Sequence, residues 1–559
     1  MIRRVRENAH RRWPRPPALI GDTFFNEDQM KPFNEQMIMR KTTAALVLFV
    51  LLLSAAQVLA EVKLASPFTD HMVFQRDMKV PVWGTADPGE SVTVEFAGQK
   101  KSVKADAGGK WRVNLDSLRA SDEGRTLTVT GSATKAAVKC EDVLVGEVWL
   151  CSGQSNMDFT VARTTRHYFA GAINETQEVA AANFPNIRMF TGGWRSSYEP
   201  QTNVSGTWLV CTPENVREFS AIGYFFARDL QKELKVPFGI LTESFGASTA
   251  EAWTSREALA ADPQLKPLLD RFDANVAAYK TNAPDMTAAL KAWEEAAAKA
   301  KADGRTAPRR PGSQNPTQDQ HNPTVMFNGM IAPIIPYAIK GVLWYQGEAI
   351  NGGTNGYKLY PLLQATLIKD WRRRWGEGDF PFYICQLAAL KPWANRPDTW
   401  YNNPDVREAQ ATVLSIPNTG MAVTIDIGDP VNIHPKNKQD VADRLKRIAL
   451  ARTYGRKLEY SGPMYDSMKV EGNAIRLKFT HVGGGLLAKG GDLKTFVIAG
   501  KDGKFVPATA RIDQGVLVVS SPDVAQPAAV RYAWENYPEG CNLYNGDGLP
   551  APPFRTDKW

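Results

Sequence analysis

The chain has 559 residues, which is too long for one ordinary domain and predicts two or three. Its 43% hydrophobic and 23% charged residues are normal for a soluble globular protein. The net charge of +8 does not indicate a nucleic-acid partner, because residues 1–60 carry +4 of it and the remainder is spread too thinly for a phosphate-binding surface.

Residues 39–60 have the pattern of a secretory signal peptide. A basic start precedes an apolar run over 44–53, and small residues ending at Ala60 form a cleavage site. The run is short for a membrane span. We therefore predict an exported protein, periplasmic or secreted, without a membrane span after cleavage. The mature chain should begin near Glu61, so residues 1–60 are not expected to belong to its fold.

The mature chain has, in chain order, three regions with different hydrophobic patterns. Short alternating runs split by Pro-Gly and Gly-Gly turns predict a β-sandwich-like module over 61–140. Residues 141–458 alternate continuous apolar runs with helical patterns, which predicts a parallel sheet with helices on both faces. A helix-forming and then loop-like insertion over about 255–322 is either a lid or a surface decoration. Residues 459–559 again predict a β module.

Four apolar runs of the α/β region end in small, polar or acidic residues. In such sheets, function gathers beyond the carboxyl ends of the strands, so these four ends should converge on one edge. The runs cover residues 143–150, 236–244, 340–348 and 419–429.

Cysteine usage predicts no metal site. The five cysteines are Cys140, Cys151, Cys211, Cys385 and Cys541, and none has the spacing of metal ligands. An odd number in an exported protein predicts at least one free thiol or an intermolecular bond.

Two residues at the predicted sheet edge indicate serine chemistry. Ser155, in GQSNM, follows the first run and should begin a helix, where unpaired N–H groups can face a developing oxyanion. His434 follows the last run and precedes a helix expected to start at Pro435, so it can act as a general base on Ser155. The alternatives are a helix-capping serine and a histidine that packs beneath its helix.

A carboxylate should orient the imidazole, and hydrogen-bond donors should face the oxyanion. Three acids could fill the first role: Glu348, Asp429 and Asp426. The candidate oxyanion or substrate-binding groups are the backbone of Gly246, the amide of Gln346 and Asn156.

Two functions from other classes compete with an esterase. A glycoside hydrolase would use paired acids such as Glu243 and Glu348. A non-catalytic glycan-binding protein would use tryptophan platforms and would not need His434.

Several stretches resemble the sialate O-acetylesterase family, a branch of the SGNH-type hydrolases. They are GQSNM, SFGASTAEAW, NGMIAPIIPYAIKGVLWYQGEA and IHPKNKQDVADRL, and SPFTDHMVFQRD resembles the family's N-terminal β region. The resemblance covers nearly all of 61–559. It implies an SGNH-hydrolase-like α/β fold flanked by β modules, with Ser155 as nucleophile, His434 as base, and Gly246 and Gln346 in the oxyanion region. Two departures are Ala247, where the family usually has glycine, and Val431, where the wider group has the aspartate.

The resemblance further implies removal of O-acetyl groups from sialic acids, with no cofactor and an O-acetylated carbohydrate as partner. Acetylated xylan or another plant polysaccharide is the alternative substrate. A sialate is anionic, and four arginines could meet its carboxylate: Arg163, Arg166, Arg372 and Arg407.

Overall fold

The fold combines a large α/β region with additional β-sheets on either side of it in the sequence. The computed structural model describes residues 61–558 except for 134–135, 284, 309–310, 312–314, 352–355 and 394–402. The predicted signal peptide therefore lies outside the described residues. Within the described ranges, no helix combines the length and the apolar composition needed to cross a membrane.

Among the described residues, seven strands form the main path of an 11-stranded sheet. Neighbours along this path are parallel except for the antiparallel pair β10–β9 at one edge. Their order is β10 (Trp208–Cys211), β9 (Phe184–Thr191), β11 (Phe238–Ser244), β8 (Val138–Gly153), β12 (Gly341–Tyr345), β13 (Phe382–Cys385) and β14 (Thr419–Ala422). The predicted parallel sheet is thus confirmed as part of a larger mixed sheet.

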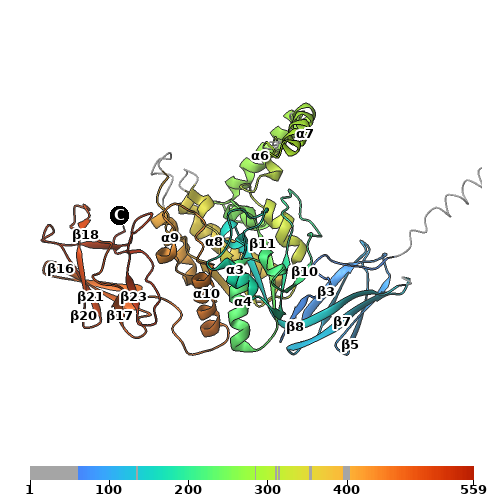
Figure 1. Cartoon of the computed structure of the whole chain (residues 1–559), viewed down its shortest axis with the longest axis horizontal. Coiled ribbons are helices and arrows are strands. Elements are labelled where there is room, and N and C mark those ends of the chain that lie inside the picture. The colour runs from blue at the N-terminus through green and yellow to red at the C-terminus, as the bar shows by residue number, and fades with distance from the viewer. Residues whose placement is uncertain are drawn as a thin grey trace, which may run out of the picture. The chain divides into compact units, whose positions relative to one another are not determined.

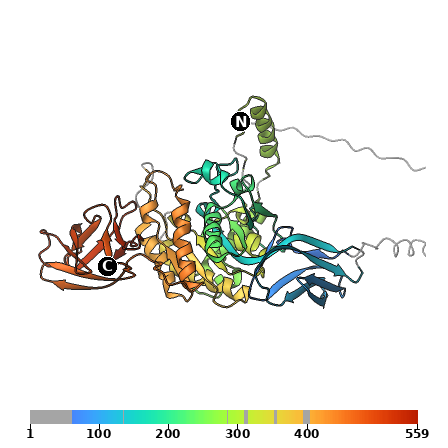
Figure 2. The ribbon, with the colours of Figure 1, turned by 60° about the horizontal axis from the view of Figure 1, so that its bottom comes forward.

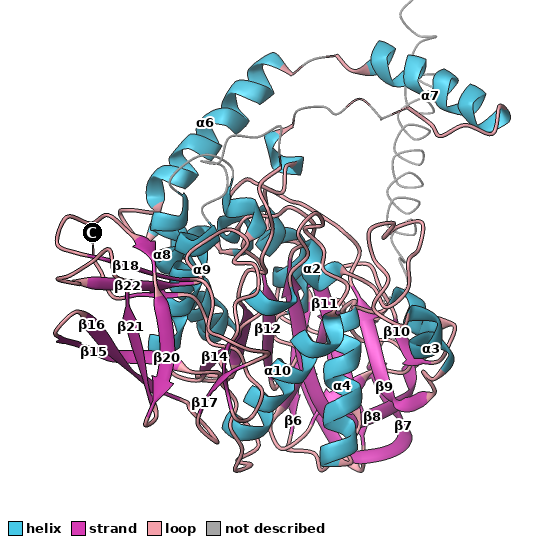
Figure 3. Ribbon diagram, turned by 60° about the vertical axis from the view of Figure 1, so that its left-hand side comes forward, coloured by secondary structure: helices cyan, strands magenta, loops and turns pink. Residues whose placement is uncertain are grey.

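Helices cover both faces of the parallel part. On one face α4 (Ala221–Leu234) and α10 (Lys438–Arg452) pack side by side against the strands (Figure 3). On the other face α8 (Gly356–Trp375) sets Trp371 edge-to-face against Trp344 of β12, with the ring centroids 5.8 Å apart. Strands β11 to β14 are buried along their whole length, which is why their sequences do not alternate between apolar and polar residues.

Strand β8 belongs both to the N-terminal β region and to the parallel sheet (Figure 1). Its first half pairs antiparallel with β7 (Ser121–Gly131), and its second half pairs parallel with β11 and β12. The boundary expected at residue 140 falls inside this strand. The other N-terminal strands are β1 (Lys63–Leu64), β2 (Val73–Gln75), β3 (Val80–Thr85), β4 (Ser91–Phe96), β5 (Gln99–Lys104) and β6 (Lys110–Leu115).

Two local expectations were wrong near His434. The last apolar run leaves the sheet at Ala422, and the segment Ile425–Ile427 is a 3₁₀ turn (η10) rather than strand. The helix α10 begins at Lys438 and not at Pro435, because the Asn437 side chain caps it by accepting the N–H of Asp440 at 3.1 Å.

The predicted insertion is helical. It contains α5 (Arg256–Ala260), α6 (Lys266–Asn282), α7 (Thr287–Ala302) and η4 (Pro316–Gln318). Helix α6 buries Leu269, Phe272 and Val276, whereas α7 buries only Ala300 among its residues.

The C-terminal region, red in Figure 2, is all-β as predicted. One four-stranded sheet has the order β15 (Met464–Glu471), β16 (Ala474–Thr480), β21 (Val516–Ser520), β20 (Thr509–Asp513). The other has the order β19 (Val506–Pro507), β18 (Phe496–Ala499), β22 (Ala529–Tyr532), β24 (Phe554–Arg555), and β17 (Leu486–Ala488) pairs with β23 (Leu543–Asn545).

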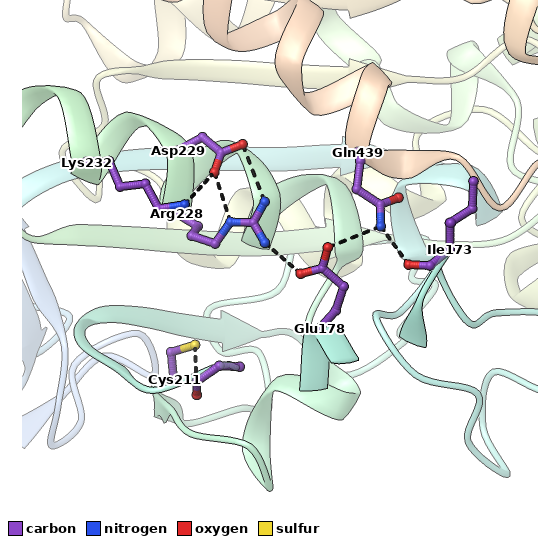
Figure 4. A network of polar contacts seen from close by, with 8 residues as sticks. Ile173, Glu178, Cys211, Arg228, Asp229, Lys232 and Gln439 are labelled. Carbon is purple, nitrogen blue, oxygen red and sulfur yellow. Dashed lines mark hydrogen bonds and ion pairs between the residues drawn. The ribbon is translucent and has the colours of Figure 1, made fainter. Parts of the chain in front are cut away.

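A polar network ties the short helix α3 (Glu175–Ala180) to α4 and α10 (Figure 4). Arg228 of α4 donates to Glu178 at 2.6 Å, and Gln439 of α10 donates to the carbonyl of Ile173 at 2.7 Å. This network fixes the segment between β8 and β9, which approaches His434 through Phe169.

Candidate active site

The chain turns sharply at the end of β8 to present Ser155. Gly153 has a φ of +130°, and a Cβ atom there would overlap the backbone of Tyr345, so only glycine fits this step. The N–H of Gln154 donates to the Tyr345 carbonyl at 2.9 Å. A single helical turn, α2 (Ser155–Asp158), follows, and Ser155 at its start is half-buried.

The structure brings Ser155 and His434 together although 279 positions separate them. His434 Nε2 lies 2.8 Å from Ser155 Oγ. The imidazole stacks on the Phe169 ring, with the centroids 4.4 Å apart. The backbone N–H of His434 donates to Asn432 Oδ1 at 2.9 Å. Burial, and secondarily the charge of Lys438, lowers the pKa of His434 to about 4. The imidazole is therefore neutral at neutral pH and able to accept the hydroxyl proton.

Ser155 and Gly246 each offer a backbone N–H group. Among the hydrogen bonds of the described residues, neither the N–H of Ser155 nor that of Gly246 donates to a protein acceptor. The two residues are adjacent, because a Cβ atom on Gly246 would lie 3.6 Å from the Ser155 Cβ. Ala247 next to them has a φ of +58°, a conformation that costs about 1 kcal/mol for a residue other than glycine.

The other two predicted oxyanion or substrate groups are engaged within the protein. Gln346 is fully buried; its Nε2 donates to the Ser248 carbonyl at 3.1 Å and its Oε1 accepts from Tyr360 at 2.9 Å. Asn156 is also buried, and its amide donates to Glu348 and to a backbone carbonyl. The expectation of a substrate-facing role for Asn156 is corrected, since both of its N–H groups have protein acceptors.

None of the predicted acids contacts the imidazole. Among the described residues, no carboxylate lies within ion-pairing distance of His434. Asp429 Oδ1 instead accepts two backbone N–H groups of its own loop at 2.9 Å each. Asp426 forms a bidentate pair with Arg444 at 2.7 Å and accepts from Tyr544 at 2.8 Å. Both acids shape the surroundings of the loop and do not orient the ring directly.

Glu348 reaches His434 only through an intermediary. Its Oε1 accepts from Asn156, whose amide also donates to the carbonyl of Ile433 at 3.0 Å, directly before His434 in the chain. Glu348 Oε2 is buried without a hydrogen-bond partner, and burial raises the pKa of this carboxyl.

Lys438 is a site residue that the sequence analysis missed. Its buried ammonium donates to Asn156 Oδ1 and to the Pro435 carbonyl, each at 2.7 Å, and lies 4.5 Å from the Phe159 ring centroid. Burial lowers the pKa of Lys438 to about 7, against the opposing influence of Glu348. A lysine in the first turn of a polar helix normally points to solvent, so no local pattern could have indicated this position.

A buried Asp–His pair lies beside the site and was also missed. Asp158 Oδ2 is 3.1 Å from His167 Nε2, while Asp158 Oδ1 accepts from Ser244 at 3.0 Å. His167 packs edge-on against Phe169 and Trp194. This pair therefore supports the residues that surround His434.

Aromatic side chains extend from the imidazole toward solvent; Tyr168, Phe169 and Trp194 are termed the aromatic wall. The Phe169 ring stacks on the His434 imidazole. Tyr168 is 75% exposed and Trp194 is 43% exposed. The Arg166 guanidinium lies 4.1 Å from the Trp194 ring centroid. Exposed aromatic rings together with a cation offer both apolar contacts and a positive charge to a ligand.

The four arginines proposed for a sialate carboxylate lie in different environments. Arg163 and Arg166 are exposed. Arg372 and Arg407 are buried and donate to backbone carbonyls, so their proposed role is wrong. The sequence could not distinguish them, because their burial is set by tertiary packing.

The acid pair of the alternative glycoside hydrolase is not assembled for catalysis. Glu243 is fully buried in β11, both of its oxygens lack hydrogen-bond partners, and burial raises its pKa well above the usual range. A carboxyl sealed inside the sheet cannot reach a glycosidic bond together with Glu348.

All five cysteines lie in the described part of the chain, and each has a free thiol. Within that part, no group of three or more His, Cys, Asp or Glu side chains is placed to hold a metal ion.

Comparisons with known proteins find carbohydrate esterases similar to this chain. A family model described as a carbohydrate esterase, sialic acid-specific acetylesterase, matches residues 320–448. The sialate O-acetylesterase of Mus musculus is 29% identical over 547 residues, covering 88% of this chain and 94% of the mouse protein. The human enzyme is 28% identical over 538 residues, covering 88% and 92%. The crystal structure of a carbohydrate acetylesterase from Xanthomonas citri has a TM-score of 0.74 and 36% identity, covering 89% of this chain and 100% of that one.

Proposed function

Because the chain belongs to the sialate O-acetylesterase family of carbohydrate esterases, we propose that it removes O-acetyl groups from sugars through an acyl-enzyme formed on Ser155. The observation that carries this proposal is the 2.8 Å contact between Ser155 Oγ and His434 Nε2 at the carboxyl edge of the parallel sheet. A non-catalytic glycan-binding protein would not need this pair. The topology also supports an SGNH-like assignment, since the two residues follow β8 and β14 of one sheet.

The proposed reaction has two halves. Ser155 Oγ attacks the acetyl carbonyl carbon while His434 Nε2 takes the hydroxyl proton. The oxyanion accepts hydrogen bonds from the N–H groups of Ser155 and Gly246. When the bond to the sugar oxygen breaks, His434 returns the proton to that oxygen. Water, deprotonated by His434, then releases acetate and restores Ser155. The mechanism requires no metal or organic cofactor.

We propose O-acetylated sialic acids as the substrates, because sialate O-acetylesterases are among the relatives and the exposed Arg166 places a cation on Trp194 of the aromatic wall, whose Phe169 stacks on His434. Acetylated xylan remains the alternative, and a panel of acetylated sialic acids and xylo-oligosaccharides assayed for acetate release decides between them. We also propose export, on the signal-peptide pattern over residues 39–60.

Arg166→Gln is expected to raise KM for an O-acetylated sialic acid about tenfold, because the substrate carboxylate loses one charge-assisted hydrogen bond. Hydrolysis of a neutral acetylated xylo-oligosaccharide should change less than about twofold, since no carboxylate is present. Arg119→Gln serves as the control, because this arginine is also exposed but lies in the N-terminal β region between β6 and β7. An equal effect on both substrates would refute recognition of the carboxylate.

Glu348→Gln is expected to lower kcat/KM by no more than about tenfold, because this carboxyl acts on His434 only through Asn156. Removal of a carboxylate that orients the ring directly costs about 10⁴-fold. Steady-state acetate release measures the difference, with Asp429→Asn as the matched control on the histidine loop. A loss of about 10⁴-fold in the glutamine variant would show that Glu348 contacts the ring during catalysis.

A further inference from the structure

Two buried side chains, Asn156 and Lys438, hydrogen-bond the backbone on both sides of His434. The carbonyl of Ile433, directly before the histidine, accepts from the Asn156 amide at 3.0 Å. The carbonyl of Pro435, directly after it, accepts from the Lys438 ammonium at 2.7 Å. The two side chains are joined to each other, because Lys438 Nζ also donates to Asn156 Oδ1 at 2.7 Å.

The same pair is fixed to the nucleophile. Asn156 follows Ser155 directly in α2. The nucleophile and one of the two side chains that hold the backbone of His434, a pair termed the clamp, therefore lie in the same helical turn. Asn156 and Lys438 are buried, and both N–H groups of the asparagine are used. A buried and interconnected hydrogen-bond network of this kind admits few alternative arrangements, which makes it suited to hold two catalytic groups in register.

We propose that Lys438, acting with Asn156, is a positioning residue that orients His434 through its backbone in place of a carboxylate on its ring. The inference rests on the proposed esterase mechanism. It accounts for a histidine that binds Ser155 Oγ while no described carboxylate reaches the ring. It also gives a role to an ammonium that would otherwise be costly to bury.

The charge of Lys438 adds a second effect on His434. The groups that face the ammonium from neighbouring elements are Glu348, Tyr345 of β12 and Cys385 of β13. Facing His434, the positive charge disfavours the imidazolium and so extends the neutral, basic form to lower pH. Removing the charge should therefore raise the pKa of the histidine and move the acidic limb of activity to higher pH.

The test compares Lys438→Met, Asn156→Ala and the double variant in the full chain. Lys438→Met is expected to lower kcat about 10- to 100-fold with KM nearly unchanged, and to move the acidic limb of kcat/KM up by about one pH unit. Because the two side chains act as one clamp, the double variant should lose little more than the more damaged single variant. Lys446→Met is the control, since this lysine lies on the same helix and pairs with Asp443 near the surface.

Lys438→Gln separates the effect of the hydrogen bonds from the effect of the charge. It also replaces Lys438→Met in the test if the methionine variant does not fold. It retains an N–H donor but no charge, so the acidic limb should still move while kcat falls less. An unmoved acidic limb in these variants, or losses that add fully in the double variant, would overturn the proposal. Activity that survives in Ser155→Ala would instead refute the esterase mechanism, and that result is obtained with Lys438 intact.

Discussion

Ser155→Ala is expected to lower kcat/KM for acetyl-ester hydrolysis by about 10⁴- to 10⁶-fold. The Oγ atom forms the covalent bond to the acetyl group, and no other hydroxyl is recorded in hydrogen-bond contact with His434 Nε2 among the described residues. The residual rate should come from the free N–H groups of Ser155 and Gly246, which still polarise a bound carbonyl. Acetate release at saturating and limiting substrate measures the effect.

Ser152→Ala is the matched control for this variant. Ser152 lies three residues before Ser155, in β8; it is fully buried, and its Oγ has no hydrogen-bond partner. Its removal should leave activity within about twofold and should not lower the melting temperature, because an unsatisfied polar group is lost. A serine-directed phosphonate should label the wild type and Ser152→Ala but not Ser155→Ala. Comparable acetate release by Ser155→Ala and the wild type would refute the nucleophile assignment.

His434→Ala is expected to lower kcat/KM by about 10³- to 10⁵-fold, because the serine hydroxyl then loses the group that takes its proton. The wild type should retain activity well below pH 6.5, since burial lowers the pKa of His434 to about 4 and the neutral base persists down to that pH. Activity should then fall as the pH drops through about 4, when the imidazolium forms. The variant should lack this acidic limb, which a pH profile of kcat/KM measures.

The control for the histidine variant is His321→Asn. His321 is exposed and hydrogen-bonds Asp319 at 2.6 Å in the helical insertion. Its substitution should alter neither the rate nor the acidic limb. An acidic limb that persists in His434→Ala would assign the titration to another group and contradict the role of His434 as the base.

The parts of the fold and site that the sequence predicted are those with a local pattern. Continuous apolar runs indicated the parallel strands, and the polar residues that follow them indicated Ser155 and His434. Strands β9 and β13 were missed because β9 carries Asn186 and Arg188 and β13 has only four residues. Their place in the sheet is determined by pairing with β11 and β12.

The hydrogen-bond partners at the site depend on contacts between distant segments. Asn156, Glu348 and Lys438 meet across separations of 192 and 282 positions, so no spacing rule relates them. The acids predicted to orient the imidazole do not contact it for the same reason. Asp426, for example, accepts hydrogen bonds from Arg444 and Tyr544, which are close to it only in the folded chain. Sequence patterns identify which residues reach the edge of a sheet, but hydrogen-bond partners there are chosen by tertiary packing.

Strand β8 is shared by the N-terminal β region and the catalytic site, because it pairs with β7 at its start and leads to Ser155 at its end. One uninterrupted backbone runs from its pairing with β7 to the turn at Gly153, so the two regions have no linker between them at which a recombination event could cut. Deleting the N-terminal strands would leave half of β8 as an unpaired edge, open to association with other chains. The N-terminal region is therefore not an exchangeable appendage, and descendants of this fold should keep or lose it together with the catalytic serine.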